Sequence, residues 1–351
     1  MGKRDKKKGK PTQLLDWEQN NLNQDWLVPW GLKVEAIEQI DSNRWKLLTE
    51  RGFKQLNRVY WKPEQLIFVQ TLLDHLGQNG FKTIPRFIRT IDGWAWVSRD
   101  KAFLFLCDWV EGINPNLLNR SHLVCATTTL AQLHYHLKGY LPSGHVSGRD
   151  NRGQWPGQWQ QVYRLIIDQV KRLGNHREFK AFDNVFLNFY NQILNQIEYA
   201  LSLLLNSEYD SLIAGLLKQP FVCHNSYREV NLTLTRQGKL YVFGFENCIF
   251  DLRIYELGRY LQRVLCLYDW DLAVGQEVLE TYEAVWPLEP AERKILLAQL
   301  WFPYPSCSYI QAYYQNGSGL SEKTFTFALQ KEINLQSARE QCLEWFYNWA
   351  C

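Results

Sequence analysis

The chain has 351 residues, of which 46% are hydrophobic and 21% charged, so it has ample apolar material for one large domain or two moderate ones. The net charge of +3 is concentrated at the start, where MGKRDKKKGK carries six basic residues and one acid. Eight dispersed cysteines argue against a zinc site and a disulfide framework, and the lack of a signal region or a long apolar run predicts no membrane span and a reducing cytosol.

The first 30 residues are expected to form a basic, disordered arm followed by an approach segment. Nucleic acid or an anionic surface could bind through this arm alone, because the rest of the chain lacks a basic stripe. Aromatic residues make up 15% of the chain, which predicts large, well-filled cores, with an aromatic ligand platform as the alternative.

Strand patterns dominate the region that follows. Residues 44–49 and 53–59 alternate around the turn Glu50-Arg51-Gly52 and predict a β-hairpin, and 32–40 looks extended or weakly helical. A helix with Pro63 at its start should cover 63–76. Further strands are predicted at 84–89, 94–98 and 102–107.

Helical spacing takes over after the connector 108–112 and predicts a mostly helical remainder. A Gly-, Pro- and Trp-rich loop is expected at 141–159. His134 and His136, near the end of the first helix, are expected to be structural, because no Asp or Ser partner lies near them in sequence. Helices are predicted at 117–137, at 160–206 as two helices, and at 211–217, 251–266, 271–284, 290–303 and 321–350.

A polar loop and a second hairpin occupy residues 221–251, inside the helical part. The loop covers 224–229, a strand opens at Asn231, Gln237-Gly238-Lys239 forms the turn, and a second strand covers 240–245 and ends at Glu246. This layout is typical of a phosphotransferase catalytic hairpin. There the loop carries a His-x-Asp base and an Asn five residues later, and an Asp that binds magnesium ends the second strand.

The frame of that hairpin is present, but its acids are missing. His224 and Asn231 stand at the expected spacing, whereas Ser226 occupies the position of the base and Gly244 that of the magnesium ligand. The turn Asp41-Ser42-Asn43 also lacks the glycines of a phosphate loop. These residues predict a kinase-like fold that has lost its chemistry.

Several short motifs together indicate a family. With these motifs, the chain from about residue 30 onward resembles the spore-coat CotS-type proteins, a branch of the aminoglycoside/choline kinase-like superfamily. The motifs are Lys62-Pro63-Glu64, Asn79-Gly80-Phe81, Ile84-Pro85-Arg86-Phe87, Asp108-Trp109-Val110-Glu111-Gly112, Leu130-Ala131-Gln132-Leu133-His134, Lys138-Gly139-Tyr140, His224 with Asn231, Phe250-Asp251-Leu252 and Glu256-Leu257.

The resemblance implies a two-lobed α+β fold of the protein-kinase-like type. A small β-rich N-lobe would span 31–107, and a larger, mainly helical C-lobe would span 108–351 and contain the hairpin of 221–251. By position, Asn57 matches the lysine that binds the nucleotide phosphates.

The resemblance also assigns the remaining site positions. Ser226 matches the base, Gly244 the metal-binding Asp, and Asn231 the second metal ligand. Asp251 matches a carboxylate that usually braces the catalytic loop, and His224 and Glu246 complete the vestigial site. A possible adenine slot comprises Leu106, Cys107, Asp108 and Trp109.

These departures favour a catalytically degenerate protein with a structural or binding role. By resemblance, it would act in the cytoplasm of the sporulating mother cell and then in the spore coat, with other coat or assembly proteins as partners. We expect no metal and no cofactor, and at most weak, magnesium-independent nucleotide binding. The reason is that Asn231 alone offers magnesium one neutral oxygen, and loss of a general base costs about 10²–10⁴ in rate.

The alternative is an active ATP-dependent phosphotransferase acting on a small amine or hydroxyl substrate. It requires that Glu246 replace the missing acid at Gly244. This replacement is feasible on a strand, because residues two apart point to the same face.

Overall fold

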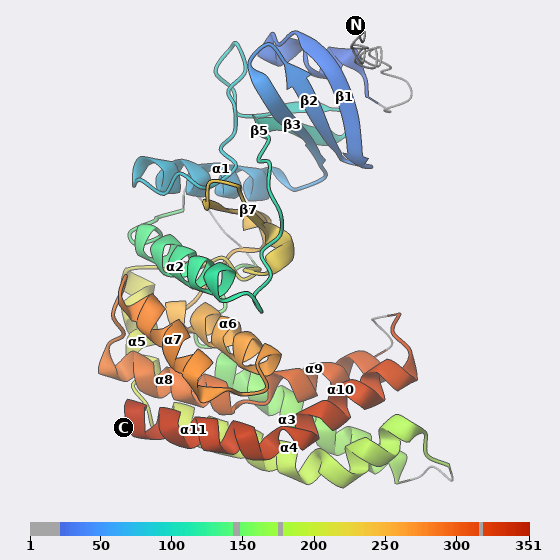
Figure 1. Ribbon diagram of the computed structural model, residues 1–351, viewed down its shortest axis with the longest axis vertical. Helices are drawn as coiled ribbons and strands as arrows, with labels where there is room; N and C mark the ends of the chain where they lie inside the picture. Colours follow the sequence, from blue (N-terminus) through green and yellow to red (C-terminus); the bar gives the residue numbers. More distant parts are fainter. Residues whose placement is uncertain (1–21, 143–147, 175–177, 316–318) are drawn as a thin grey trace, which may run out of the picture. The chain divides into compact units, whose positions relative to one another are not determined.

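A five-stranded antiparallel sheet in the order β1-β2-β3-β5-β4 forms the first part of the chain (Figure 1). The computed structural model describes residues 22–142, 148–174, 178–315 and 319–351, so most of the predicted arm lies outside the described residues. The predicted hairpin is confirmed, because β2 pairs with β3 in register from Arg44–Asn57 to Thr49–Gly52. The strands are β1 Val34–Asp41, β2 Arg44–Thr49, β3 Gly52–Val59, β4 Val97–Arg99 and β5 Ala102–Asp108.

One predicted strand is wrong. Residues 84–89 form only a single bridge, Ile88 to Leu106, because Pro85 has no N–H to donate to a sheet ladder. The strand predicted at 94–98 is β4, which begins at Val97 and is shorter than expected.

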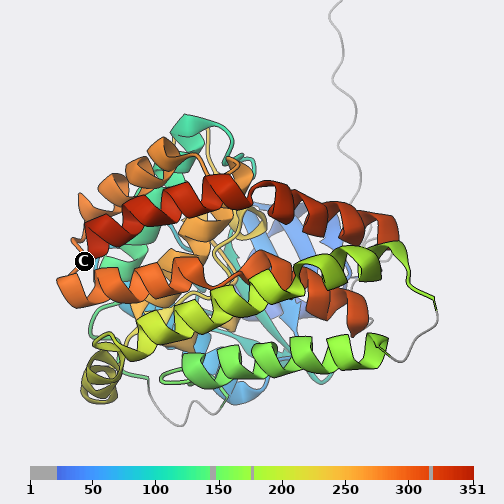
Figure 2. The same cartoon turned by 90° about the horizontal axis from the view of Figure 1, so that it is seen from below.

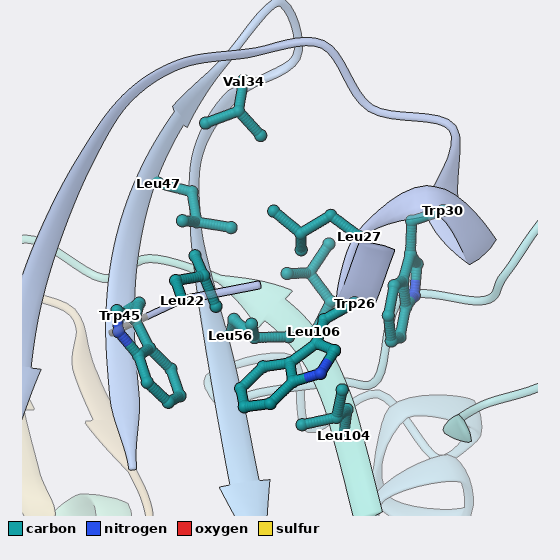
Figure 3. Close-up of a cluster of buried hydrophobic side chains, with 10 residues drawn as sticks. All are labelled: Leu22, Trp26, Leu27, Trp30, Val34, Trp45, Leu47, Leu56, Leu104 and Leu106. Atoms are coloured by element: carbon teal, nitrogen blue, oxygen red, sulfur yellow. The ribbon is translucent and has the colours of Figure 1, made fainter. Parts of the chain in front are cut away.

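The approach segment is part of the core of the sheet. Two 3₁₀ helices, η1 Gln24–Trp26 and η2 Val28–Trp30, place the side chains of Trp26 and Trp30 on the sheet, as Figure 3 shows. The rings of Trp26 and Trp45 meet edge to face at 5.9 Å, and the Nε1 of Trp30 donates to the carbonyl of Ile88 at 2.8 Å. The cluster comprises Leu22, Trp26, Leu27, Trp30, Val34, Trp45, Leu47, Leu56, Leu104 and Leu106.

Residues Thr233–Glu246 group with this sheet, although we expected the whole hairpin in the helical lobe. The strands β7 Leu232–Leu234 and β8 Leu240–Val242 pair with each other. Leu234 bridges to Ile113, and the N–H of Val242 donates to the carbonyl of Thr83 at 3.0 Å. A Cβ at Gly112 would lie 2.4 Å from the Leu234 carbonyl oxygen, which explains the glycine in the connector. Among the described residues, this sheet unit comprises 22–113, Pro142 and Thr233–Glu246, and includes α1 Pro63–Gln78.

The helical unit comprises, of the residues that the structure describes, Asn114–Leu141, 148–174, 178–232, 247–315 and 319–351. Figure 2 shows its long helices α3, α4, α8 and α11 running side by side, and α4 packs on α3, α8 and α10. Its helices are α2 Arg120–His136, α3 Trp155–Leu173, α4 Ala181–Leu205, α5 Tyr209–Lys218, α6 Arg253–Leu267, α7 Leu272–Glu283, α8 Pro290–Trp301, α9 Tyr304–Tyr314, α10 Glu322–Asn334 and α11 Gln336–Ala350.

Most predicted helices of this unit are confirmed to within a few residues. The helix α4 shows why the spacing is reliable: Phe182, Phe186, Phe189 and Ile193 recur at three and four residues and are all buried. The predicted helix 321–350 is instead two helices that meet at Leu335, and α3 begins inside the predicted loop, at Trp155. Among the described residues, no helix has both the length and the apolar character that crossing a bilayer requires.

Candidate functional site

Asn57, which we expected to match the phosphate-binding lysine, lies on β3 with 7% of its surface exposed. Its Oδ1 accepts a hydrogen bond from Gln55 Nε2 at 2.6 Å, and its Nδ2 lies 3.6 Å from the Sγ of Cys107. Burial raises the pKa of the Cys107 thiol to about 12, so this neighbour is neutral. The amide of Asn57 is therefore bonded to neutral groups of the sheet itself.

The turn between β1 and β2 is where we expected the glycine-rich phosphate loop of a kinase. Here Arg58 fastens the turn, because its Nε donates to Asn43 Oδ1 at 3.1 Å and its Nη2 to the carbonyl of Ser42 at 2.6 Å. The N–H of Asn43 in turn donates to Asp41 Oδ1 at 2.8 Å. Side chains hold this turn in place where a phosphate loop would offer its N–H groups to a ligand.

The residues of the possible adenine slot are at the end of β5. Leu106 and Cys107 are buried, and the Asp108 carboxylate pairs with Lys54. The indole N–H of Trp109 donates to Glu111 at 2.7 Å, and the ammonium of Lys46 lies 4.6 Å from the Trp109 ring centroid. Leu106 belongs to the buried core cluster of the sheet, and the two nearby lysines, Lys46 and Lys54, are paired with carboxylates.

The end of the second hairpin strand differs from the prediction. The strand β8 stops at Val242, Gly244 has a left-handed φ of +85°, and Phe245–Asn247 form a 3₁₀ helix. The predicted strand 240–245 is therefore wrong beyond Val242. Since Gly244 and Glu246 are not on a strand, the shared-face argument for Glu246 as a substitute acid no longer applies. The Glu246 carbonyl accepts from Gln65 Nε2 on α1 at 3.4 Å.

In the helical unit, Ser226 and Asn231 bond to each other. The Nδ2 of Asn231 donates to both the hydroxyl and the carbonyl oxygen of Ser226, each at 2.9 Å. Asn231 ends the 3₁₀ helix Glu229–Asn231, so the strand begins one residue later than predicted. His224 is fully buried, and its Nδ1 accepts from the backbone N–H of Ser226 at 3.3 Å.

Glu256 on α6 holds the loop that carries these residues, and sequence reasoning missed this role. Its carboxylate accepts the backbone N–H groups of His224 and Asn225, each at 2.7 Å, and Asn225 has a left-handed φ of +60°. The Nε2 of His134 lies 3.0 Å from the same carboxylate. Burial opposes the charge of Glu256, but these hydrogen bonds keep its pKa below the ordinary value. The partner of His134 is 122 residues away, which explains why no nearby acid could be found.

Asp251 is fully buried and joins α6 to the start of α3. Its Oδ2 accepts from Asn151 Nδ2 at 2.5 Å and from Trp155 Nε1 at 2.8 Å, and its Oδ1 accepts from the N–H of Leu252 at 2.8 Å. Burial outweighs these bonds and raises the pKa of Asp251 to about 7. Asp251 was expected to brace the catalytic loop. Its carboxylate bonds to Asn151, Trp155 and Leu252, whereas the backbone of the His224 loop bonds to Glu256.

A comparison with solved structures defines the class of fold. The aminoglycoside phosphotransferase of Alicyclobacillus acidocaldarius subsp. acidocaldarius is 20% identical, with a TM-score of 0.81 over 94% of this chain and 96% of that one. The AMP-bound spectinomycin phosphotransferase is 15% identical, with a TM-score of 0.59 over 91% and 96% of the two chains. The fold is therefore that of the aminoglycoside phosphotransferases, as the sequence predicted.

The family follows from the sequence match. Residues 24–346 match the family described as "Spore coat putative kinase YutH", and the chain belongs to that family. Spore coat protein S of Bacillus subtilis (strain 168) is 23% identical over 323 residues, which cover 90% of each chain. The predicted relation to spore-coat CotS-type proteins is confirmed.

Proposed function

We propose that this chain is a catalytically inactive, kinase-like protein with a structural or binding role in the spore coat. The observation that carries the proposal is the bonding of Ser226, which stands where the catalytic base would be. Its hydroxyl accepts a hydrogen bond from the neutral amide of Asn231. A hydroxyl so bonded cannot take a proton from a substrate near neutral pH.

His224 is the one base that sequence reasoning left open beside Ser226. Its Nδ1 accepts from the Ser226 backbone N–H, and the ring is fully buried. The Nδ1 lone pair is used by the backbone, so His224 does not activate the hydroxyl through that atom.

The sheet unit supports the same proposal. Phosphoryl transfer requires a cation on the phosphates and a metal held by a carboxylate. Asn57 is neutral and bonded to Gln55, and Gly244 offers no side-chain ligand. Lys46 and Lys54, the lysines near the adenine slot, pair with Glu111 and Asp108.

The spore-coat role rests on the family and on the name of the Bacillus subtilis relative. By this proposal the protein acts through contacts with other coat or assembly proteins, after synthesis in the mother cell. It needs no metal and no cofactor. The alternative, phosphotransfer to a small amine or hydroxyl substrate, requires Glu246 to replace the metal-binding acid that is missing at Gly244.

Thermal unfolding with ATP tests the proposal. A ligand that binds only the native state adds about 2.7 kcal/mol at a hundredfold excess over its Kd. We expect melting curves in ATP with magnesium to overlay those in ATP with EDTA, because no charged group at the matched positions binds the metal. An active phosphotransferase of the same fold is the positive control.

A magnesium-dependent rise in melting temperature would contradict the proposal. If that rise disappears in Glu246→Gln, Glu246 supplies the carboxylate that the metal needs. Phosphotransfer assays would then replace the inactive interpretation.

A further inference from the structure

A cavity of about 420 Å³ lies in the helical unit, lined by the loop 225–228, one face of α6 and the first turns of α9. This volume is in the range of pockets that hold small organic ligands. The loop is the one that Glu256 fixes through its backbone, so one wall of the cavity has a defined shape.

One side of α6 forms a polar wall of this cavity. On α6, Tyr255, Arg259 and Arg263 follow one another at intervals of four and line the cavity, while Leu257 and Leu261 on the same helix are fully buried. Arg228 contributes from the loop, and Tyr304 from α9.

The charges in this wall do not balance. Three arginines line the cavity against one acid, Glu256, whose carboxylate is already bonded to His134 and to two backbone N–H groups. Arg263 lies 3.4 Å from Glu229. Within the described part of the chain, neither Arg228 nor Arg259 has a carboxylate oxygen within 4.0 Å.

Of the three arginines in this wall, Arg263 is the most buried. Its Nε is buried and has no hydrogen-bond partner among the described residues. Burial lowers the pKa of Arg263, and the nearby charge of Arg228 lowers it further. An anion between these guanidinium groups would supply the missing acceptor and offset their repulsion.

Arg259 is oriented by aromatic rings. Its guanidinium carbon lies 5.4 Å from the ring centroid of Tyr255 and 5.2 Å from that of Tyr304, and its Nη1 donates to the Tyr255 hydroxyl at 3.2 Å. Rings that hold a guanidinium leave its remaining N–H groups for an acceptor, and they also provide flat apolar surface for the body of a ligand.

We propose that this cavity binds a small organic anion, with Arg228, Arg259 and Arg263 on its phosphate or carboxylate and the tyrosine rings against its body. The inference goes beyond the proposed function and holds whether or not the chain transfers phosphate. Because ATP is the probe for catalysis and sugar anions are the probes here, the two proposals fail separately.

Four sugars of similar size but different charge test the inference: glucose 6-phosphate, glucuronate, glucose and glucosamine. Thermal unfolding and calorimetric titration are run at one ionic strength, set with sodium chloride. We expect glucose 6-phosphate, glucuronate or both to bind and raise the melting temperature, and the neutral and cationic sugars to do neither. The two anions show whether the arginines select phosphate or carboxylate.

The variant Arg228→Gln/Arg259→Gln removes the two cations that have no carboxylate partner among the described residues. Both residues are exposed, and their loss should weaken anion binding about tenfold or more. Arg164→Gln removes an exposed arginine of α3 that does not line the cavity, and should bind as the unaltered protein does. The inference is wrong if neither anion binds at millimolar concentrations, if glucose or glucosamine binds equally well, or if the double variant retains full affinity.

Discussion

In the helical unit, buried carboxylates accept hydrogen bonds from segments that are far away in the sequence, whereas in the sheet unit the neutral amide of Asn57 bonds within the sheet, to Gln55 on its own strand and to Cys107 on the neighbouring strand. Glu256 and Asp251 lie in the interior and accept hydrogen bonds from His134 and Trp155, at separations of 122 and 96 residues. Asn57 instead bonds to Gln55, two residues away. Buried acids thus hold distant segments of the helical unit together, while Asn57, which we expect to match a phosphate-binding lysine, is a neutral residue.

The largest effect is expected for Glu256→Ala. It leaves two backbone N–H groups and His134 without their acceptor in a fully buried site. Removing one member of such a buried network should lower the free energy of unfolding by about 3 kcal/mol or more. Chemical denaturation measures the loss, and an unchanged midpoint would show that the His224 loop does not depend on Glu256.

Asp251→Ala should have the next largest effect. Three donors, from Asn151, Trp155 and Leu252, lose their acceptor. We expect a loss of about 1–3 kcal/mol in the same denaturation experiment. A melting temperature equal to that of the unaltered protein would refute the structural role of Asp251.

Asp251 should also make stability depend on pH. Its pKa in the folded protein is raised to about 7, so folding favours the protonated acid. This contribution is complete below the unfolded-state pKa of about 3.9 and is lost as the pH rises through about 7. Between about pH 5 and pH 8, stability should fall more steeply in the unaltered protein than in Asp251→Asn. Parallel profiles would contradict the raised pKa.

The smallest effect is expected in the sheet unit, for Lys54→Ala. The pair of Lys54 with Asp108 involves an exposed carboxylate, so its removal should cost at most about 1 kcal/mol. It should also leave the melting curves in ATP unchanged, since Lys54 is paired. A change in the ATP melting curves of Lys54→Ala would show that Lys54 contacts the nucleotide, and would contradict the interpretation that this lysine is occupied by Asp108.

The sequence predicted the fold class and most helices because hydrophobic periodicity and glycine or proline boundaries are local signals. The matches of Asn57, Ser226 and Gly244 to catalytic positions came from the family resemblance and stay predictions. The hydrogen bonds of Glu256 could not be predicted, since nothing near this residue marks a partner 122 residues earlier. The 3₁₀ turn after Gly244 was missed because the apolar residues 242–245 continue the strand pattern.

The cavity could not be predicted for a related reason. The spacing of Tyr255, Arg259 and Arg263 on one helix is visible in the sequence. The chain gives no sign that Arg228 and the start of α9 meet that face, because this depends on packing between distant elements.

The contacts of Asn57 bear on how this protein could evolve. A lysine at this position would leave the Nε2 of Gln55 without its acceptor and place an ammonium group beside the neutral, buried thiol of Cys107. A lysine introduced at residue 57 alone should therefore lower the free energy of unfolding, because it removes these hydrogen bonds and brings a charge into the interior of the sheet. If Asn57 does match a phosphate-binding lysine, restoring that cation would require Gln55 and Cys107 to change with it.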